Sequence, residues 1–295
     1  MRQELALLAA LVSGALVALQ QRIYGELGKA LHDPLLAAVV SFGSGLVVMS
    51  VLVLRRLDVL RQVRKLPPAL CIGGLGGATL VAVGATAAPK IGVALLTVGL
   101  VSGTTVAALA VDRAGLGPGG HRPITPPRLA GAVLCLGAIV LTASQGLRAA
   151  SPLLLMLVVL AGGLISVQQA LNARVRAATD ATVATFVNFT VGTTALVLCL
   201  ALQQLLGHVR ADRWPTEPWL YFGGAMGCAF IAVAAVVVGT LGVLRFGLAA
   251  TAGQLLGGVL LDLDRGVDLL TVAAVALTLV AVGVSGLGAR RPVAV

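Results

Sequence analysis

Charged side chains are scarce in this 295-residue chain, at 11% of the residues, and aromatic ones are scarcer still, at 3%. Soluble domains carry about 25% charged residues, so the composition excludes an ordinary water-soluble fold. Hydrophobic residues make up 58% of the chain and form continuous runs, unlike the alternating segments of a membrane β-barrel. Because about 20 apolar residues span a bilayer as a helix, the sequence predicts an all-α polytopic membrane protein.

Signatures of catalysis, metal binding and nucleic-acid binding are also lacking. The three histidines and four cysteines are isolated and show no metal-ligand spacing. A net charge of +10 is compatible with nucleic-acid binding, but the basic residues lie in short segments between apolar runs, without interleaved aromatics. We therefore expect no enzyme activity, no cofactor, no metal and no nucleic-acid partner, and we interpret the charge as a topology signal.

Ten apolar runs are separated by charged residues, prolines and glycines, five in each half of the chain. They lie near residues 5–24, 34–54, 68–88, 91–111, 128–147, 152–172, 182–206, 218–239, 242–261 and 268–288. The least certain breaks fall at Ala88–Val93 and Val238–Val243. Without them, each pair of runs would be a helix about 66 Å long, twice the thickness of a bilayer. We therefore expect a tight helical hairpin at both breaks.

Lysine and arginine are unevenly distributed over the ends of these runs. With a cytoplasmic N-terminus, the inner segments hold 14 of the 21 basic residues and the outer segments hold 7. Because basic residues favour the cytoplasmic side, we expect both termini in the cytoplasm of a protein that crosses the bacterial inner membrane several times. The most basic segment, residues 55–65, is expected to lie on the anionic inner leaflet of the lipid bilayer.

The second half of the chain repeats the motifs of the first half in the same order. At offsets of 147 to 150 residues the chain pairs Gly14/Gly162, Gln20/Gln168, Gln21/Gln169, Phe42/Phe189, Gly45/Gly192, Pro68/Pro218, Gly77/Gly227, Gly92/Gly242, Gly103/Gly253 and Asp112/Asp262. This similarity divides the chain into an N-terminal five-helix repeat, residues 1–149, and a C-terminal one, residues 150–295. Because five is odd, the second repeat is inverted in the membrane, as in many secondary transporters.

The repeated motifs resemble the YdcZ type of inner-membrane exporters, which belongs to the drug/metabolite transporter superfamily. Its Gln-x-x-x-Asn and Ser-Phe-x-x-Gly pattern is matched by "GALVALQQRIYGELGKALHDPLLAAVVSFGSG" and "GGLISVQQALNARVRAATDATVATFVNFTVG". Its Pro-Lys-x-Gly-Val and Gly-Gln segments are similar to "PKIGVALLTVGLVSG" and "GTLGVLRFGLAATAGQ". The resemblance covers nearly the whole chain in a fused double-length form. It implies ten transmembrane helices in two inverted five-helix repeats, and export of small metabolites or drugs. Tyr24 and Thr104 depart from the pattern, whereas Asn172 and Gln254 keep it.

Polar residues inside the apolar runs are candidates for substrate binding, because each needs a hydrogen-bond partner in hydrocarbon. The candidates are Gln20, Tyr24, Ser41, Thr104, Gln168, Asn172, Asn188 and Gln254. Gln20 and Tyr24 share one helical face, and Gln168 and Asn172 share another, since each pair is four residues apart. Hydrogen bonding between helices accounts for the same residues without a substrate. Gln21 and Gln169 point about 100° away and are interpreted as packing residues.

All eleven acidic residues map to the ends of apolar runs or to loops. A carboxylate in mid-membrane ordinarily marks a proton or cation site. We therefore expect a neutral, zwitterionic or anionic small-molecule substrate and only weak dependence of transport on a pH gradient. Four charged residues near run ends, Asp112, Asp262, Lys90 and Arg245, are candidates for gating ion pairs, although snorkelling and loop solvation explain them as well.

The function predicted from these patterns is that of a secondary transporter. It would export a small metabolite or drug-like molecule by alternating access, with the substrate site between the two repeats. A passive channel and a membrane scaffold subunit without transport activity are the alternatives. A channel should have a continuous polar lining, and a scaffold should transport nothing. A monomer and a homodimer both fit the sequence.

Overall fold

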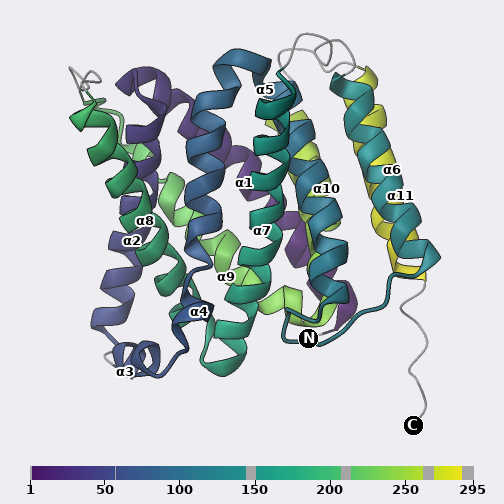
Figure 1. The fold of residues 1–295 in the computed structure, drawn as a ribbon, viewed down its shortest axis with the longest axis horizontal. Coiled ribbons are helices and arrows are strands. Elements are labelled where there is room, and N and C mark those ends of the chain that lie inside the picture. Colours follow the sequence, from purple (N-terminus) through teal and green to yellow (C-terminus); the bar gives the residue numbers. More distant parts are fainter. Residues whose placement is uncertain (1, 57, 144–150, 207–213, 262–268, 288–295) are drawn as a thin grey trace.

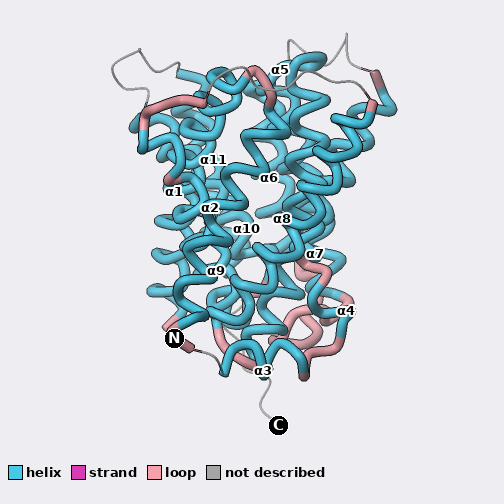
Figure 2. Tube along the Cα trace, turned by 90° about the vertical axis from the view of Figure 1, so that its left-hand side faces the viewer, coloured by secondary structure: helices cyan, strands magenta, loops and turns pink. Residues whose placement is uncertain are grey.

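The computed structural model describes residues 2–56, 58–143, 151–206, 214–261 and 269–287, and every regular element in these ranges is a helix. The helices stand side by side in one bundle (Figure 1) (Figure 2). The first repeat contains α1 (Gln3–Leu31), α2 (Pro34–Leu54), α3 (Asp58–Arg64), α4 (Pro68–Cys71), α5 (Gly74–Arg113) and α6 (Pro126–Ala143). The second repeat contains α7 (Pro152–Ala178), α8 (Ala181–Leu205), the 3-10 helix η2 (Pro218–Tyr221), α9 (Gly223–Leu241), α10 (Val243–Leu261) and α11 (Leu269–Gly286).

Six helical segments in the described ranges are long and apolar enough to cross a membrane: α1, α2, α7, α8, α10 and the segment Pro218–Leu241. A seventh is added if α3 and residues 68–84, which meet at a bend of 117°, count as one span. Large apolar side chains such as Val47 and Leu198 are 64% and 66% exposed, as suits a surface in contact with lipid. These helices agree with a polytopic membrane protein, while the count of ten spans stays a prediction.

The reversal expected at Ala88–Val93 is made by a bent helix, so the predicted break there is wrong. α5 contains both apolar runs without interruption. Nevertheless Gly76 lies against Leu164 of α7, and Gly103 lies against the adjacent Gly163. The two α5 glycines would be about 40 Å apart in a straight helix, so α5 must double back, as Figure 1 shows. Pro89, which lacks a backbone N–H, kinks a helix without necessarily ending it.

The corresponding reversal in the second repeat is a true break, as the sequence predicts for Val238–Val243. α9 ends at Leu241, and α10 begins at Val243. Gly242 between them has a φ of 81°. A side chain at this position would be strained, because L-residues with a Cβ rarely adopt positive φ.

The second helix of each repeat begins with the same N-cap. One oxygen of Asp33 accepts hydrogen bonds from the backbone N–H groups two and three residues further along, at 2.9 and 3.1 Å. Asp180 accepts the equivalent pair at 2.7 and 3.0 Å. Each cap satisfies two donors that have no partner inside the helix. The two repeats therefore share local chemistry as well as sequence.

The repeats interlock, because the first helix of each packs against the hairpin of the other. α1 lies along α9 and α10, and α7 lies along α5. A Cβ at Gly14 would lie 2.0 Å from the Ala250 carbonyl oxygen, and a Cβ at the equivalent Gly162 would lie 2.0 Å from that of Leu100. The fifth helices, α6 and α11, pack on each other at one side of the bundle (Figure 1). Matched contacts of this kind describe a pseudo-twofold arrangement.

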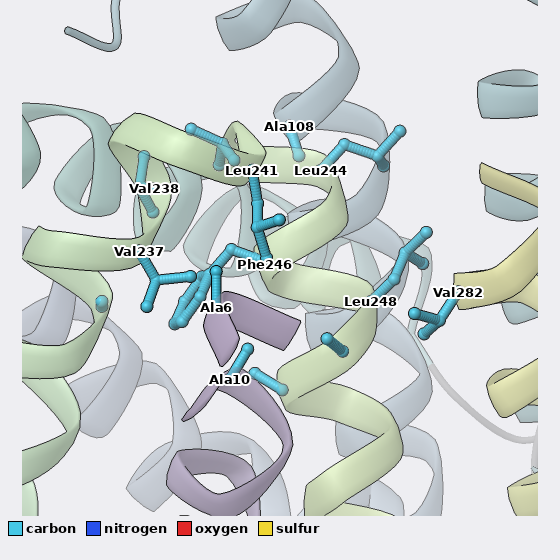
Figure 3. Close-up of a cluster of buried hydrophobic side chains, with 14 of the residues drawn as sticks. Ala6, Ala10, Ala108, Val237, Val238, Leu241, Leu244, Phe246, Leu248 and Val282 are labelled. Carbon is cyan, nitrogen blue, oxygen red and sulfur yellow. The ribbon is translucent and has the colours of Figure 1, made fainter. Parts of the chain in front are cut away.

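The largest hydrophobic cluster in the described ranges lies where α1 begins. It joins residues of α1, α5, α6, α7, α9, α10 and α11. Figure 3 shows the Phe246 ring of α10 beside Val237 of α9 and Ala6 of α1. Because Phe246 is fully buried among residues of both repeats, this core belongs to neither repeat alone.

Candidate functional site

Gln20 and Gln168 occupy equivalent places against glycines of the opposite repeat. A Cβ added at Gly77 of α5 would lie 3.3 Å from Gln168 Oε1. At the equivalent Gly227 of α9, it would lie 2.8 Å from Gln20 Nε2. A larger residue at either position would press on the end of the glutamine side chain and shift it. The symmetry between the repeats thus extends to these polar side chains.

In the second repeat, three buried amides lie close together, and we name Gln168, Asn172 and Asn188 the amide cluster. Their exposed fractions are 5%, 3% and 1%. Asn172 Nδ2 donates a hydrogen bond of 2.9 Å to Asn188 Oδ1. Gln168 Oε1 is buried and has no hydrogen-bond partner among the described residues. An unpaired buried acceptor costs about 1–3 kcal/mol, so this oxygen is available for a ligand donor.

The first repeat does not reproduce the amide pair. Tyr24, the counterpart of Asn172, donates from its hydroxyl to the Pro34 carbonyl oxygen at 2.6 Å. It also lines an open groove of about 550 Å³, together with Gly25, Gly28, Lys29, His32 and Pro34. Ser41, the counterpart of Asn188, is 6% exposed and lies against Gly223. Tyr24 therefore bonds to a backbone carbonyl at the start of α2, whereas Asn172 bonds to the side chain of Asn188.

Thr104 and Gln254 both make contacts between helices of opposite repeats. The Thr104 hydroxyl lies 3.0 Å from the carbonyl oxygen of Gly162 in α7. Gln254 Nε2 donates to Gln21 Oε1 at 2.9 Å, which agrees with the interpretation of Gln21 as a packing residue. Gln169 is 4% exposed, and its Oε1 lacks a partner within the described residues. These contacts leave the assignment of Thr104 and Gln254 to a substrate site untested.

Asp112 is buried at 3% exposure, so loop solvation does not describe it. Its carboxylate forms a salt bridge with Arg128 at the start of α6. The same carboxylate accepts hydrogen bonds from the backbone N–H groups of Val243 and Leu244, at 2.8 and 3.2 Å. Asp112 of the first repeat therefore caps α10 of the second repeat.

Arg122 holds the other side of the break at Gly242. Its guanidinium donates to the carbonyl oxygens of Gly239 and Thr240, at 3.2 and 3.1 Å, where α9 ends. Its backbone N–H donates to the Asp112 carbonyl oxygen at 2.8 Å. Burial lowers the pKa of Arg122 by more than the neighbouring Asp112 raises it. We name Asp112, Arg122 and Arg128 the Asp112 junction.

The other candidates for gating ion pairs are placed differently. Arg245 is 8% exposed, so it does not snorkel to solvent. Lys90 is exposed at the bend of α5. Asp262 lies outside the described residues. Within the described part of the chain no ion pair joins any two of the four candidates, and Asp112 pairs instead with Arg128.

Sequence reasoning missed Arg122 and Arg128 as structural partners. Both lie in or next to the loop after α5, and their basic character was assigned to topology. The predicted break could have indicated such partners. A helix interrupted at Gly242 leaves carbonyls on one side and N–H groups on the other without partners inside the helix, so polar side chains are needed nearby. Among the described residues, no group of three or more His, Cys, Asp or Glu could hold a metal ion.

Comparisons with known proteins address the chain as a whole. The model of a family described as "DMT_YdcZ: Putative inner membrane exporter, YdcZ" matches residues 5–141 and again residues 153–286. No match is found among curated proteins. Solved structures of ten chains match, including one described as "Crystal structure of protein" with a TM-score of 0.69 and 22% identity over 98% of both chains. At that identity the likeness shows a shared fold.

Proposed function

The chain belongs to the YdcZ family of inner-membrane exporters, whose model matches both repeats, and on that premise we propose that it is a secondary transporter. It exports a small metabolite or drug-like molecule across the bacterial cytoplasmic membrane by alternating access. The two repeats rock against each other around a substrate site at their interface. Both termini face the cytoplasm, in keeping with α1 starting and α11 ending at the same end of the bundle (Figure 1).

The observation that carries this proposal is the amide cluster. Gln168 Oε1 is buried and unpartnered, beside glycines of the opposite repeat. A substrate with hydrogen-bond donors satisfies this oxygen, and the Asn172–Asn188 pair offers further amide groups next to it. Gln20, at the equivalent position against Gly227, supplies the half-site of the first repeat. Sites between inverted repeats are the usual location in secondary transporters.

The cargo is neutral, zwitterionic or anionic. Asp33 and Asp112 are the buried carboxylates in the described ranges, and each caps a helix. A carboxylate engaged in this way is a poor carrier of protons across the membrane, because its protonation would cost the cap. Transport should accordingly depend only weakly on an imposed pH gradient.

The test begins with a thermal-shift screen of a metabolite set against the purified full chain. A hit is then assayed for uptake into proteoliposomes by wild type, Gln168→Ala, Asn172→Ala and the control Thr194→Ala, which changes an exposed residue of α8. Losing one hydrogen bond to a buried ligand group weakens binding by about 10-fold. We expect that loss in the two amide variants and none in the control. Normal transport by both amide variants would refute the site.

Counterflow separates the transporter from the alternatives. Liposomes preloaded with unlabelled substrate drive labelled substrate inward against its gradient only if the protein alternates between two access states. A channel lets the label equilibrate without accumulation. A scaffold subunit gives no flux above empty liposomes.

A further inference from the structure

Arg245 is a buried cation with no counter-charge among the described residues. It lies in the first turn of α10 and is 8% exposed. Its Nε has no hydrogen-bond partner, and Arg245 forms no ion pair with any described residue. Burying an unpaired charge costs several kcal/mol, and proteins ordinarily avoid it by pairing or by binding a ligand. An arginine in this state indicates that a partner is missing.

The surroundings of Arg245 are strongly positive. Gly242, three residues before Arg245 in the chain, lies against the side chains of both Arg122 and Asp112. The only buried carboxylate nearby in the described ranges is Asp112, whose oxygens are already used by Arg128 and by the N–H groups of α10. The start of α10 therefore has three arginines, Arg122, Arg128 and Arg245, near a carboxylate whose oxygens are already bonded. Among the described residues, the positive charges here exceed the negative ones.

The Arg245 guanidinium lies against the C-terminal end of α11. A Cβ at Gly286, the last residue of α11, would lie 2.8 Å from Arg245 Nη2. A side chain at 286 would therefore push against the guanidinium. The negative end of the α11 dipole compensates a cation only in part, by about 0.3–1 kcal/mol at exposed sites. It leaves the hydrogen-bonding capacity of Nε unused.

We propose that Arg245, together with Arg122, forms an anion-binding site at the end of the bundle where α1 begins. The ligand is an oxyanion, a carboxylate or a phosphate group. The planar fork of a guanidinium matches two oxygens of such a group, and both forms hydrogen bonds and supplies the missing charge. The site is separate from the amide cluster, and binding there does not depend on the proposed transport activity.

The same oxyanion chemistry has two sources, a soluble anion and the phosphate of an anionic lipid headgroup. If the end of the bundle with Arg245 faces the cytoplasm, the site lies where cargo enters an exporter. It would then select cargo with a negative group. This last step rests on the proposed function, whereas the binding site itself does not.

Anion binding is tested by thermal unfolding of the full chain in nanodiscs of zwitterionic lipid. Inorganic phosphate and acetate are compared with sodium chloride at matched ionic strength. A ligand that binds only the folded state raises Tm with its concentration. We expect phosphate or acetate to do so for wild type, and Arg245→Gln to weaken that binding about 10-fold or more. Arg245→Lys should retain part of the effect. Arg55→Gln, which removes an exposed arginine, should leave it unchanged.

The stability of Arg245→Gln without added anion gives a second readout. Removing an unpaired buried charge should leave Tm equal to that of wild type or higher. A variant that fails to fold, or that unfolds at lower temperature in chloride alone, would show that Arg245 has a structural role and would overturn the proposal. The same conclusion follows if neither phosphate nor acetate shifts the Tm of wild type beyond chloride.

Nanodiscs that contain anionic lipid distinguish the two sources. If the headgroup is the occupant, the phosphate shift disappears in these discs and Arg245→Gln retains less anionic lipid in native mass spectrometry. If a soluble anion is the occupant, the phosphate shift persists. The result is independent of the transport assay, because a failure of Gln168→Ala to impair transport leaves the anion site standing, and absence of an anion effect leaves the amide cluster standing.

Discussion

The two helical hairpins of this protein reverse direction in different ways. In the first repeat α5 stays helical from Gly74 to Arg113 and bends back on itself. In the second repeat the helix stops at Leu241 and restarts at Val243, with Gly242 at positive φ. A helix that continues through its bend keeps most of its backbone hydrogen bonds, whereas a broken helix exposes N–H groups and carbonyls at both new ends that need partners.

The partners for the broken hairpin come from the first repeat. Asp112 supplies acceptors for the start of α10, and Arg122 supplies donors for the end of α9. Among the described residues, the break in the second repeat therefore depends on side chains of the first repeat, whereas α5 stays helical through its own reversal. Residues of the first repeat thus pair with the free backbone groups at the break in the second hairpin, and the variants below compare the two repeats.

The largest effect is expected for Asp112→Ala. The variant leaves Arg128 buried without its carboxylate and removes the cap of α10. Breaking a buried pair by removing one partner destabilises by about 3–5 kcal/mol, and we expect a loss of stability in that range. Thermal or denaturant unfolding in detergent measures it.

Asp58→Ala is the matched control for Asp112→Ala, because it removes an exposed carboxylate that also contacts an arginine. Exposed ion pairs contribute about 0–1 kcal/mol, so its effect should be small. Equal losses for Asp112→Ala and Asp58→Ala would mean that the Asp112 junction does not hold the second hairpin.

A smaller and symmetric effect is expected for Gly103→Ala and Gly253→Ala. The new Cβ would lie 1.8 Å from the Val159 carbonyl oxygen in one case and 1.9 Å from that of Leu11 in the other. Since backbone must shift in both, each should cost about 1–3 kcal/mol. Unfolding of the two variants is compared with that of Gly43→Ala.

Gly43 lies in α2 with no atom within 4 Å of its Cβ position, so Gly43→Ala should be neutral or stabilising by up to about 1 kcal/mol. If only one of Gly103→Ala and Gly253→Ala is destabilising, the close approach of the first helix to the opposite hairpin is not shared by the two repeats.

The smallest effect is expected for the N-caps of the second helices. Asp33→Ala and Asp180→Ala should each destabilise the protein by about 1 kcal/mol, because both side chains make the same two capping hydrogen bonds. Each carboxylate also has one distant side-chain partner, Gln203 for Asp33 and Arg56 for Asp180, so the two losses should stay similar. Chemical denaturation at neutral pH measures the two losses. A clear difference between them would extend the inequality of the repeats to their caps.

The pH dependence of the Asp180 cap has a defined sign. Burial raises the pKa of Asp180, but hydrogen bonds from the Val183 N–H and from Arg56 outweigh it and lower the pKa below its usual 3.8. The cap therefore contributes fully at pH values well above the unfolded pKa of Asp180, and the contribution is lost as pH falls through the lowered pKa of the folded state. The difference in stability between wild type and Asp180→Ala should shrink in acid, as unfolding at several pH values would show.

Much of the fold follows from local patterns in the sequence. Matched motifs such as Gly103/Gly253 predict the repeat, and a 44-residue apolar stretch is too long for one membrane crossing, so both hairpins could be expected. Gly242 even predicts the position of the break. Whether Pro89 bends or breaks α5 could not be predicted, because that depends on how α7 packs along it.

Less of the candidate site than of the fold could be predicted from the sequence. The spacing of Gln168 and Asn172 predicts that they share a face, but the hydrogen bond to Asn188 comes from a different helix. The burial of Asp112 and Arg245 was missed because hydropathy counts a charged residue at a run end as solvated. Both are covered by neighbours that are distant in sequence, which no local pattern records.

The interlocked packing of α1 with α9 and α10 has a consequence for biosynthesis. More than 200 residues separate the end of α1 from the start of α10. At about 5–20 residues per second, a ribosome needs about 10–40 s to reach the partner helix. Throughout that interval Gly14 and Gln20 lack their native neighbours. The newly synthesised first half must therefore remain in the membrane until translation is nearly complete, while lipid headgroups, water or an insertion factor hydrogen-bond to its polar groups.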